Sequence, residues 1–258
     1  MSKKLVITFE GIEGSGKSLH LRNVARYLKK KKISFIKLRE PGGSKNSEKI
    51  RKLILHNKST LDKKTDLLLY LAARNENVVS IINKNYKKKV ILIDRFTDST
   101  IAYQYYGMNI DKKIIYLINN YILKNIKIDF TFLHLVNKKN LNLRLNKRVR
   151  LNKYDKFKNF FYVKVQNGFL KLSKKNKKKY MVVNSNNNIN ENKTLIIETI
   201  KEKLVDQTIT IPSCDDKKIS RIEDLLKLGA YAFKRGKLKE SNELLKNILN
   251  SLGLNSLT

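Results

Sequence analysis

The residues from Gly11 to Ser18 constrain the fold of this chain more than any other segment. They read Gly-Ile-Glu-Gly-Ser-Gly-Lys-Ser and match the pattern G-x-x-x-x-G-K-[ST]. The apolar run of residues 5–9 precedes them, and a segment with helical spacing of apolar residues follows. A strand, a glycine-rich turn and a helix in this order form a loop whose backbone N–H groups and helix N-terminus bind phosphate. The sequence therefore predicts an α/β fold that binds a nucleoside triphosphate.

Each part of this loop has a predicted role. We expect Lys17 to reach the outer phosphates and the Ser18 hydroxyl to hold Mg²⁺, the metal ion that accompanies ATP. The residues expected to bind the ATP phosphates are Gly11, Ile12, Glu13, Gly14, Ser15, Gly16, Lys17 and Ser18. The loop alone does not say which reaction uses the nucleotide.

Apolar runs of strand length alternate with longer segments of helical periodicity along the chain. Strands are predicted at 33–38, 90–94, 130–136 and 180–184, and helices at 46–57, 62–84, 97–105, 111–124, 138–150, 154–174 and 190–204. Continuous apolar strands joined by helices indicate a parallel sheet covered on both faces. Ligands bind beyond the carboxyl ends of such strands, so the loop and Asp94 are expected to meet at one site.

The composition suits one α/β domain and an appendage. The chain has 258 residues, of which 41% are hydrophobic, and its formal net charge is +34. Because lysine far outnumbers arginine and is scattered, biased codon usage explains this charge better than a specific nucleic-acid surface, which we do not expect. The chain has no apolar run long enough to span a membrane and no signal-peptide pattern, and its one cysteine is Cys214. These features favour a cytoplasmic protein without disulfides.

The composition changes after residue 204. Residues 1–204 are expected to form the phosphate-loop domain, residues 205–218 a linker, and residues 219–258 a helical hairpin of unknown role. The hairpin pattern fits a single tetratricopeptide-like unit and equally an ordinary pair of amphipathic helices. One such unit cannot bury its own apolar face, so we expect it to pack on another surface.

Several arginines and one carboxylate stand near turns in this lysine-rich chain. Arg51, Arg74 and Arg95 favour contacts that need a planar, bidentate donor, such as a phosphate or a base. Asp94 ends a predicted buried strand, where a carboxylate can orient Mg²⁺ or begin the next helix. The turn at 39–43, Arg-Glu-Pro-Gly-Gly, would be an ordinary surface turn on its own.

Taken together, these motifs resemble bacterial thymidylate kinase over residues 3–204. The resemblance rests on the phosphate loop, the 39–43 turn, Arg51, the segment Leu-Tyr-Leu-Ala-Ala-Arg at 69–74, and Asp-Arg-Phe-Thr-Asp-Ser-Thr-Ile-Ala-Tyr-Gln at 94–104. It implies the nucleoside monophosphate kinase fold, with five parallel strands flanked by helices. It also implies transfer of the ATP γ-phosphoryl group to dTMP, assisted by Mg²⁺.

The resemblance further implies the roles of individual residues. Arg51 and Arg95 would hold the dTMP phosphate, Arg74 would bind the thymine ring, and Tyr70 stands where the family usually has a phenylalanine that stacks on the base. Glu13, Thr100, Tyr103 and Gln104 would complete the dTMP pocket, and Asp94 would join Ser18 at the metal. Lys17 and Arg95 would be catalytic, with Arg148 and Arg150 from the lid.

The lid is expected at 144–155. Because the phosphate loop has Gly14 and no arginine, the resemblance implies the type in which the lid supplies that charge, with Arg148 as first candidate and Arg150 as second. The chain departs from the usual pattern at Lys153, Asn152, Leu135 and Leu19. Lysine at 153 lacks the guanidinium fork, so weaker ATP contacts are expected there.

Three alternatives stay open from the sequence. The first is another nucleoside or nucleotide kinase of the same fold. The second is a scaffold that presents the C-terminal hairpin, although intact Lys17, Ser18, Asp94 and Arg95 argue against a decayed site. The third is an ATPase stimulated by nucleic acid. Family members are commonly homodimers through helices, and we expect a homodimer here.

Overall fold

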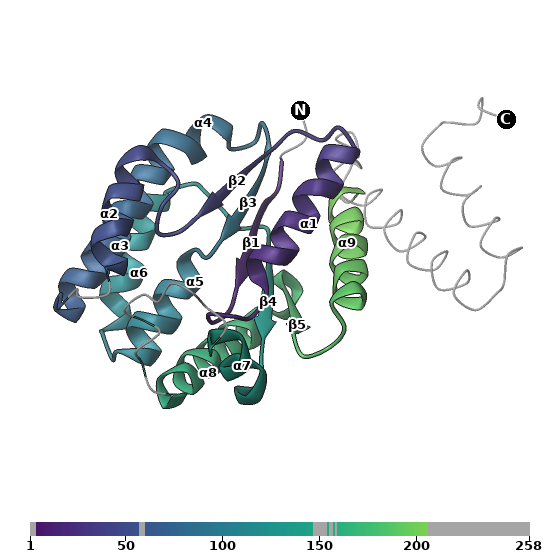
Figure 1. Ribbon diagram of the computed structural model, residues 1–258. Helices are drawn as coiled ribbons and strands as arrows, with labels where there is room; N and C mark the ends of the chain where they lie inside the picture. The colour runs from purple at the N-terminus through teal and green to yellow at the C-terminus, as the bar shows by residue number, and fades with distance from the viewer. Residues whose placement is uncertain (1–3, 57–59, 147–153, 155–156, 158, 206–258) are drawn as a thin grey trace, which may run out of the picture. The chain divides into compact units, whose positions relative to one another are not determined.

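The computed structural model describes residues 4–56, 60–146, 154, 157 and 159–205 (Figure 1). All of them belong to one compact unit, Met1–Thr208. The predicted hairpin, nearly all of the linker, and lid residues 147–153 and 155 lie outside the described residues, so those expectations stay predictions. Within the described part of the chain, no helix is long and apolar enough to cross a membrane.

The core of the fold is the predicted parallel sheet. Its strands are β1 (Val6–Glu10), β2 (Phe35–Arg39), β3 (Val90–Asp94), β4 (Phe130–Leu135) and β5 (Tyr180–Asn184), in the order β2-β3-β1-β4-β5. Every neighbouring pair is parallel, and Phe9 of β1 stands opposite Asp94 of β3. The five-stranded sheet predicted from the sequence is therefore confirmed. Its register brings the carboxyl ends of β1, β2 and β3 to one edge.

Alternate side chains of the strands pack into two separate apolar cores, one on each face of the sheet. Ile7 and Leu92 point to the face covered by α1 (Lys17–Lys30) and α9 (Ile189–Val205). Val6, Ile91 and Ile93 point to the other face, which α3 (Lys63–Asn77) and α6 (Lys112–Leu123) cover (Figure 1). Side chains of a strand alternate between faces, so continuous apolar runs are what a doubly covered sheet requires.

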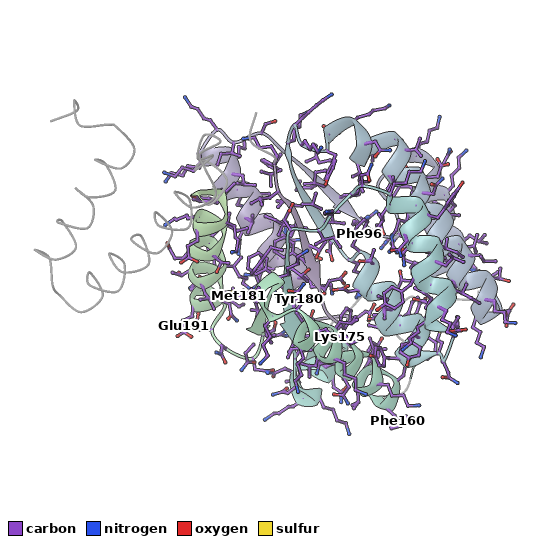
Figure 2. The ribbon with its side chains drawn as sticks, turned by 180° about the vertical axis from the view of Figure 1, so that it is seen from behind. Phe96, Phe160, Lys175, Tyr180, Met181 and Glu191 are labelled. Atoms are coloured by element: carbon purple, nitrogen blue, oxygen red, sulfur yellow. The ribbon has the colours of Figure 1, made fainter. Side chains whose placement is uncertain are left out.

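The remaining helical segments lie around these layers. They are α2 (Lys45–Leu55), the π-helical turn η1 (Val78–Ile82), α4 (Asn83–Asn85), α5 (Thr97–Thr100), the π-helical turn η2 (Ile101–Gly107), α7 (Lys138–Asn146), α8 (Asn159–Lys175) and the short 3₁₀ turn η4 (Lys177–Lys179). Figure 2 shows Phe160 and Lys175 on α8, with Tyr180 and Met181 on the neighbouring β5.

Two predicted boundaries were wrong for local reasons. The helix expected over 62–84 is interrupted by η1, where Ser80 donates its hydroxyl to the carbonyl of Glu76 and β-branched residues crowd the turn. The second strand begins at Phe35 instead of Ile33, because the Ile33 N–H donates back to the Leu28 carbonyl (2.9 Å) and closes α1.

The helix predicted over 154–174 also begins later than expected. Its first residue is Asn159, and Tyr154 instead lies in a short turn, with its ring buried. This residue proves to belong to the wall of the cavity described next.

Candidate active site

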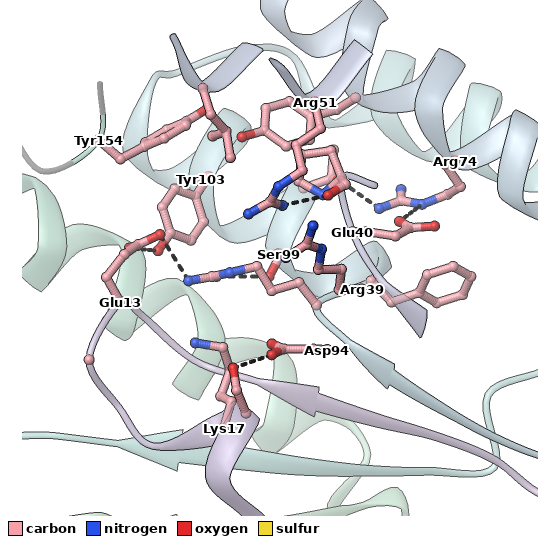
Figure 3. A pocket seen from close by; sticks show the side chains of 18 of the residues that line it. Glu13, Lys17, Arg39, Glu40, Arg51, Arg74, Asp94, Ser99, Tyr103 and Tyr154 are labelled. Carbon is pink, nitrogen blue, oxygen red and sulfur yellow. Dashed lines mark hydrogen bonds and ion pairs between the residues drawn. The ribbon is translucent and has the colours of Figure 1, made fainter. Parts of the chain in front are cut away.

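A cavity of about 460 Å³ opens at the carboxyl edge of the sheet (Figure 3). It lies between the phosphate loop, the turn after β2, helix α3 and the segment after β3. The residues that line it are Glu13, Gly14, Gly16, Lys17, Ser18, Leu19, Arg22, Arg39, Glu40, Pro41, Arg51, Leu55, Tyr70, Arg74, Asp94, Arg95, Phe96, Ser99, Thr100, Tyr103, Gln104 and Tyr154. Every residue predicted to bind dTMP is therefore on its wall.

The phosphate loop has the backbone that its glycines allow. Gly11 has φ 134° and packs so tightly that a Cβ there would stand 2.3 Å from the carbonyl oxygen of His134. Gly16, at φ 90°, precedes the first turn of α1 in the left-handed region that favours glycine. Gly11, Ile12 and Ser15 do not line the cavity themselves. These three residues lie on the side of the loop away from the cavity, whereas Gly14 and Gly16 line the cavity.

Lys17 is held at the base of the cavity by the loop it belongs to. Its Nζ donates to the Ile12 carbonyl (2.8 Å), and its side chain is largely buried. Burial, together with the positive charge of Arg95, lowers the pKa of Lys17 to about 8. Asp94, Glu13 and Glu10 oppose this shift, and the buried ammonium is suited to take up the negative charge of a phosphate.

Ser18 and Asp94 meet although they are 76 residues apart. The Ser18 hydroxyl donates to Oδ2 of Asp94, which Figure 3 shows near Lys17 at the lower end of the cavity. The phosphate loop places Ser18 at the start of α1, and the β1–β3 pairing brings the end of β3 beside it. Asp94 does not begin the next helix, since the residue before α5 is Phe96 and no side chain caps that helix.

Arg95 lies between the phosphate loop and the acceptor side of the cavity. Its guanidinium donates to the Gly11 carbonyl (2.9 Å) and to Oε1 of Glu13 (2.9 Å), and it lies over the Tyr103 ring at 5.2 Å. Tyr103 donates its hydroxyl to the same Glu13 carboxylate. Burial alone would raise the pKa of Glu13, but Arg95 and Lys17 lower it below its usual value. Glu13 therefore stays ionised and fixes both Arg95 and Tyr103.

The backbone at Arg95 has φ 65°, a left-handed conformation that a non-glycine residue keeps only where its surroundings enforce it. Glu10 supplies part of that constraint. Its buried carboxylate accepts from the Phe96 N–H (2.7 Å) and from the Ser99 hydroxyl (2.6 Å). Burial, and the neighbouring Asp98, raise the pKa of Glu10 to about 7. No pattern in the sequence indicates this role for Glu10.

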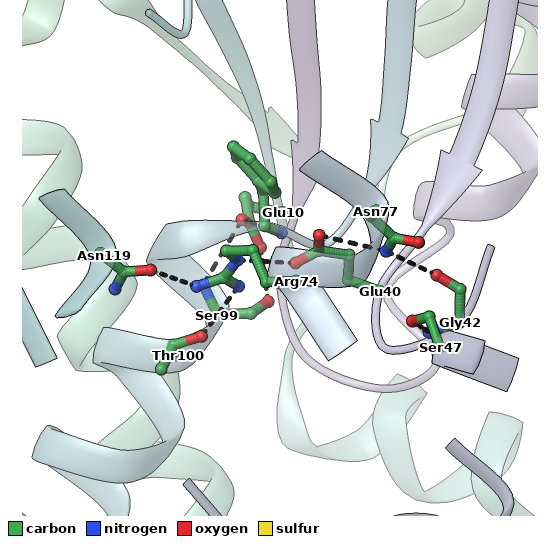
Figure 4. Close-up of polar contacts among 10 residues, drawn as sticks. Glu10, Glu40, Gly42, Ser47, Arg74, Asn77, Ser99, Thr100 and Asn119 are labelled. Atoms are coloured by element: carbon green, nitrogen blue, oxygen red, sulfur yellow. Dashed lines mark hydrogen bonds and ion pairs between the residues drawn. The ribbon is translucent and has the colours of Figure 1, made fainter. Parts of the chain in front are cut away.

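Arg74 is the largest side chain among those that are almost fully buried, with 2% of it exposed. It donates from Nε to Glu40 (2.8 Å), from Nη1 to Asn119 (2.5 Å) and from Nη2 to Thr100 (3.0 Å), as Figure 4 shows. The Phe96 ring lies 5.0 Å from its guanidinium carbon. These contacts fix the orientation of Arg74, whose edge forms part of the cavity wall.

Glu40 and Asn119 are functional residues that sequence reasoning missed. Glu40 belongs to the 39–43 turn, and Asn77 also donates to its carboxylate (3.4 Å). Burial raises the pKa of Glu40, and Arg74 opposes that shift. Asn119 lies on α6, and no sequence motif connects it with α3. Only the packing of α6 against α3 places it beside Arg74.

Two residues of the segment predicted as the lid, Arg144 and Tyr154, make contacts beside the cavity. Tyr154 lies against Tyr103 with ring centroids 5.6 Å apart. Arg144 donates to the carbonyls of Gly14 (2.9 Å) and Ser185 (2.7 Å), so it fixes the phosphate loop against the loop after β5. The predicted catalytic residues Arg148 and Arg150, with Asn152 and Lys153, lie outside the described residues.

Comparisons with known proteins agree with this geometry. The family model described as thymidylate kinase matches residues 9–196. The chain is 37% identical over 204 residues to a thymidylate kinase of Mycoplasma capricolum, covering 78% of this chain and 96% of that one. It is 37% identical to a thymidylate kinase of Acholeplasma laidlawii, covering 78% and 100%.

A solved structure shares the fold as well as the sequence. The crystal structure of thymidylate kinase from Ehrlichia chaffeensis matches with a TM-score of 0.63 and 32% identity, over 77% of this chain and 98% of that one. The residues that the family model matches include the phosphate loop, Arg51, Arg74 and Arg95. The chain belongs to the thymidylate kinase family.

Proposed function

We infer that this chain transfers the γ-phosphoryl group of ATP to the phosphate of dTMP, giving dTDP and ADP. One observation carries the inference: the acceptor residues from α2, α3 and the segment after β3 line the same cavity as Lys17 and Ser18. A donor and an acceptor phosphate can therefore meet inside it. Phosphoryl transfer needs such positioning and charge neutralisation more than covalent chemistry.

On the donor side, the backbone N–H groups of the loop and the N-terminus of α1 would hold the ATP phosphates. Lys17 would neutralise the oxygens between the β- and γ-phosphates. Its depressed pKa, about 8, leaves it mostly protonated at neutral pH. Arg144 supports the carbonyl of Gly14 and so keeps the N–H groups of the loop directed at the nucleotide.

On the acceptor side, Arg74 and Gln104 would bind the edge of the thymine ring. A guanidinium has five N–H bonds, of which three are used among the described residues, so two are left for a ligand. The Nε2 of Gln104 is buried without a hydrogen-bond partner in the described part of the chain. A buried amide of this kind is stabilised when a ligand carbonyl accepts from it. Thr100 and Tyr70 would complete the base pocket.

The acceptor phosphate would lie between Arg51 and Arg95. Arg51 donates to the Pro41 carbonyl, and its guanidinium reaches into the cavity from α2 (Figure 3). Arg95 faces it from the segment after β3. Two guanidinium groups match the charge of a phosphate dianion and orient its oxygen toward the donor. The Arg95 pKa is raised well above its usual value, mainly by Glu13 against the effect of burial, so its charge is permanent.

Ser18 and Asp94 fit an Mg²⁺ ion that is bound chiefly by phosphates and water. They provide a hydroxyl and a carboxylate oxygen side by side at the phosphate loop, the hard oxygen ligands that this ion prefers. When bound, the ion would neutralise charge on the transferred phosphoryl group. We further propose that Arg148, or failing that Arg150, adds positive charge from the lid.

The test is an ADP-release assay over a panel of nucleoside monophosphates, with and without DNA. Turnover that depends on dTMP is expected, and no rate above background with dTMP would refute the proposal. Preference for another monophosphate would favour a different kinase of this fold, and DNA-stimulated turnover without dTMP would favour an ATPase. A chain truncated after residue 204 should keep full activity, and a partner bound only by the tail would support the scaffold alternative.

We also propose that a second copy of the chain covers an exposed apolar face of α6. Ile114, Leu117 and Tyr121 share one side of this helix, and Leu117 and Tyr121 are 71% and 76% exposed. Leu68, 56% exposed, lies on α3, which packs beside α6. Exposure of such an apolar face to water is unfavourable, and the face suits a symmetric contact between two copies.

We propose, from the sequence, that the reaction takes place in the cytoplasm.

Light scattering after size-exclusion chromatography tests the dimer. The parent chain is expected at twice its monomer mass, and Leu117→Lys is expected at the monomer mass. Leu195→Lys, which changes an equally apolar residue that is 48% exposed on α9, is the matched control and should remain a dimer. A monomeric parent chain, or a dimer that survives Leu117→Lys, would overturn the assignment.

A further inference from the structure

Three residues of helix α3 lie one turn apart on one side of the helix, and the last two line the acceptor cavity. They are Asp66, Tyr70 and Arg74, at positions i, i+4 and i+8, which share one side of a helix. Arg74 and Tyr70 have roles in the proposed function. Asp66 does not, although its side chain is buried (2% exposed). A buried carboxylate is costly unless hydrogen bonds stabilise it, so its presence calls for an explanation.

Tyr154 connects Asp66 with the cavity. Its hydroxyl donates to Oδ2 of Asp66 (2.9 Å), across 88 residues of sequence. A carboxylate can only accept, so Tyr154 gives its proton to Asp66. The Tyr154 ring in turn meets the Tyr70 ring edge-on. The contacts thus run from Asp66 to Tyr154 to Tyr70.

Tyr154 itself is held from several sides. Its carbonyl accepts from the Tyr162 hydroxyl (2.9 Å), which ties its backbone to α8. Its ring meets the Tyr103 ring edge-on with centroids 5.6 Å apart, and lies at 6.4 Å from the Tyr70 ring. Burial first, and then Tyr70 and Asp66, raise the pKa of Tyr154 well above its usual value, so the hydroxyl keeps the proton it donates. Tyr154 is therefore held in one position, and its ring provides a fixed surface for the Tyr70 ring to pack against.

We propose that Asp66 is a positioning residue for the acceptor pocket, which acts through the Tyr154 hydroxyl to hold the Tyr70 ring in place. This inference rests on the proposed function, in which Tyr70 faces the base of the acceptor nucleotide. Asp66 fixes the Tyr154 hydroxyl, and the Tyr154 ring then packs edge-on against the Tyr70 ring and limits its movement. A ring that is already oriented loses less freedom when a base stacks on it.

Steady-state kinetics of the full-length Tyr154→Phe, Asp66→Asn and double variants test the proposal. A net hydrogen bond of about 1 kcal/mol corresponds to a change of about fivefold. Each single variant should raise the KM for dTMP by about that factor and leave the KM for ATP and kcat unchanged. Because both substitutions break one link, the double variant should be no worse than either single variant. Tyr27→Phe, a half-buried tyrosine on α1 outside the cavity, should change neither KM.

Asp66→Asn also serves as the second route if Tyr154→Phe folds poorly. It keeps the size of the side chain and removes its charge, and it should raise the KM for dTMP in the parent chain but not in Tyr154→Phe. A double variant in which the two effects multiply, equal changes in the KM of ATP and dTMP, or no change at all would overturn the proposal. Absence of dTMP turnover in the parent chain would instead refute the proposed function.

Discussion

Replacing Arg74 by lysine tests the base pocket most directly, because it keeps the positive charge and removes only the shape of the guanidinium. Glu40 still has a cationic partner in this variant, so no buried charge is left alone. The ammonium cannot reach Glu40, Asn119 and Thr100 together, since their bonds leave three different nitrogens of the guanidinium. Arg74→Lys should therefore lose two buried hydrogen bonds and the fixed edge that faces the ligand.

The magnitude follows from the number of bonds. Two lost bonds to buried, otherwise polar partners cost about 2 to 4 kcal/mol in the free energy of unfolding. For a unit of this size, that corresponds to a fall in Tm of about 5 to 15 °C. The variant also loses a charge-assisted contact to the edge of the thymine ring, which contributes about 3 kcal/mol. We therefore expect kcat/KM for dTMP to fall by about 100-fold.

Thermal unfolding and coupled ADP release measure the two effects separately. Arg26→Lys is the control, since Arg26 is an exposed residue of α1 whose side chain bonds only the neutral Asn23 (3.3 Å) among the described residues. It should change Tm and kcat/KM within experimental error. If Arg74→Lys were folded and retained kcat/KM for dTMP within threefold of the parent chain, the assignment of Arg74 to the thymine ring would be wrong.

Three further predictions concern the phosphate loop. Ser18→Ala removes the hydroxyl that contacts Asp94, so the Mg²⁺ concentration for half-maximal rate should rise about tenfold or more; an unchanged midpoint in a Mg²⁺ titration would exclude Ser18 from the metal site. Gly11→Ala would place a Cβ 2.3 Å from the His134 carbonyl oxygen at φ 134°, so urea unfolding should show a loss of about 3 kcal/mol or more, and a neutral result would contradict the packing. The pKa of Lys17 is lowered to about 8 by burial and Arg95, and ATP needs its charged form, so ATP affinity should fall as the pH rises from about 7 to 9. In Lys17→Arg the side chain stays charged and calorimetry should give a flatter profile; parallel profiles would show that Lys17 does not titrate there.

The sequence predicted the sheet and the phosphate loop well because both depend on short-range patterns. Apolar runs such as 90–94 mark buried strands, and the spacing of glycines from Gly11 to Gly16 marks the loop. It failed at Ile33 and at Val78–Ile82, where one backbone or hydroxyl hydrogen bond decided the boundary. Such bonds depend on local geometry that residue periodicity does not record.

The candidate site shows the same division. The motifs predicted that Arg51, Tyr70, Arg74, Arg95 and Gln104 bind the acceptor, and these residues line one cavity. Glu10, Glu40 and Asn119, which hold neighbouring residues in place, were not identified from the sequence. Tertiary packing determines which residues they contact, and no sequence motif marks them.

The sequence by itself thus determined the fold class, the nucleotide-binding loop and the family, since short contiguous segments of a few residues indicate each of them. Only the tertiary structure decided which side chains orient the acceptor arginines and tyrosines. Tyr154 was assigned to a lid by its position in the chain, yet it reaches Asp66 across 88 residues. The physical reason is that a hydrogen bond between segments far apart in the sequence forms only after the apolar cores have fixed the relative positions of these segments, and that packing is a property of the whole domain.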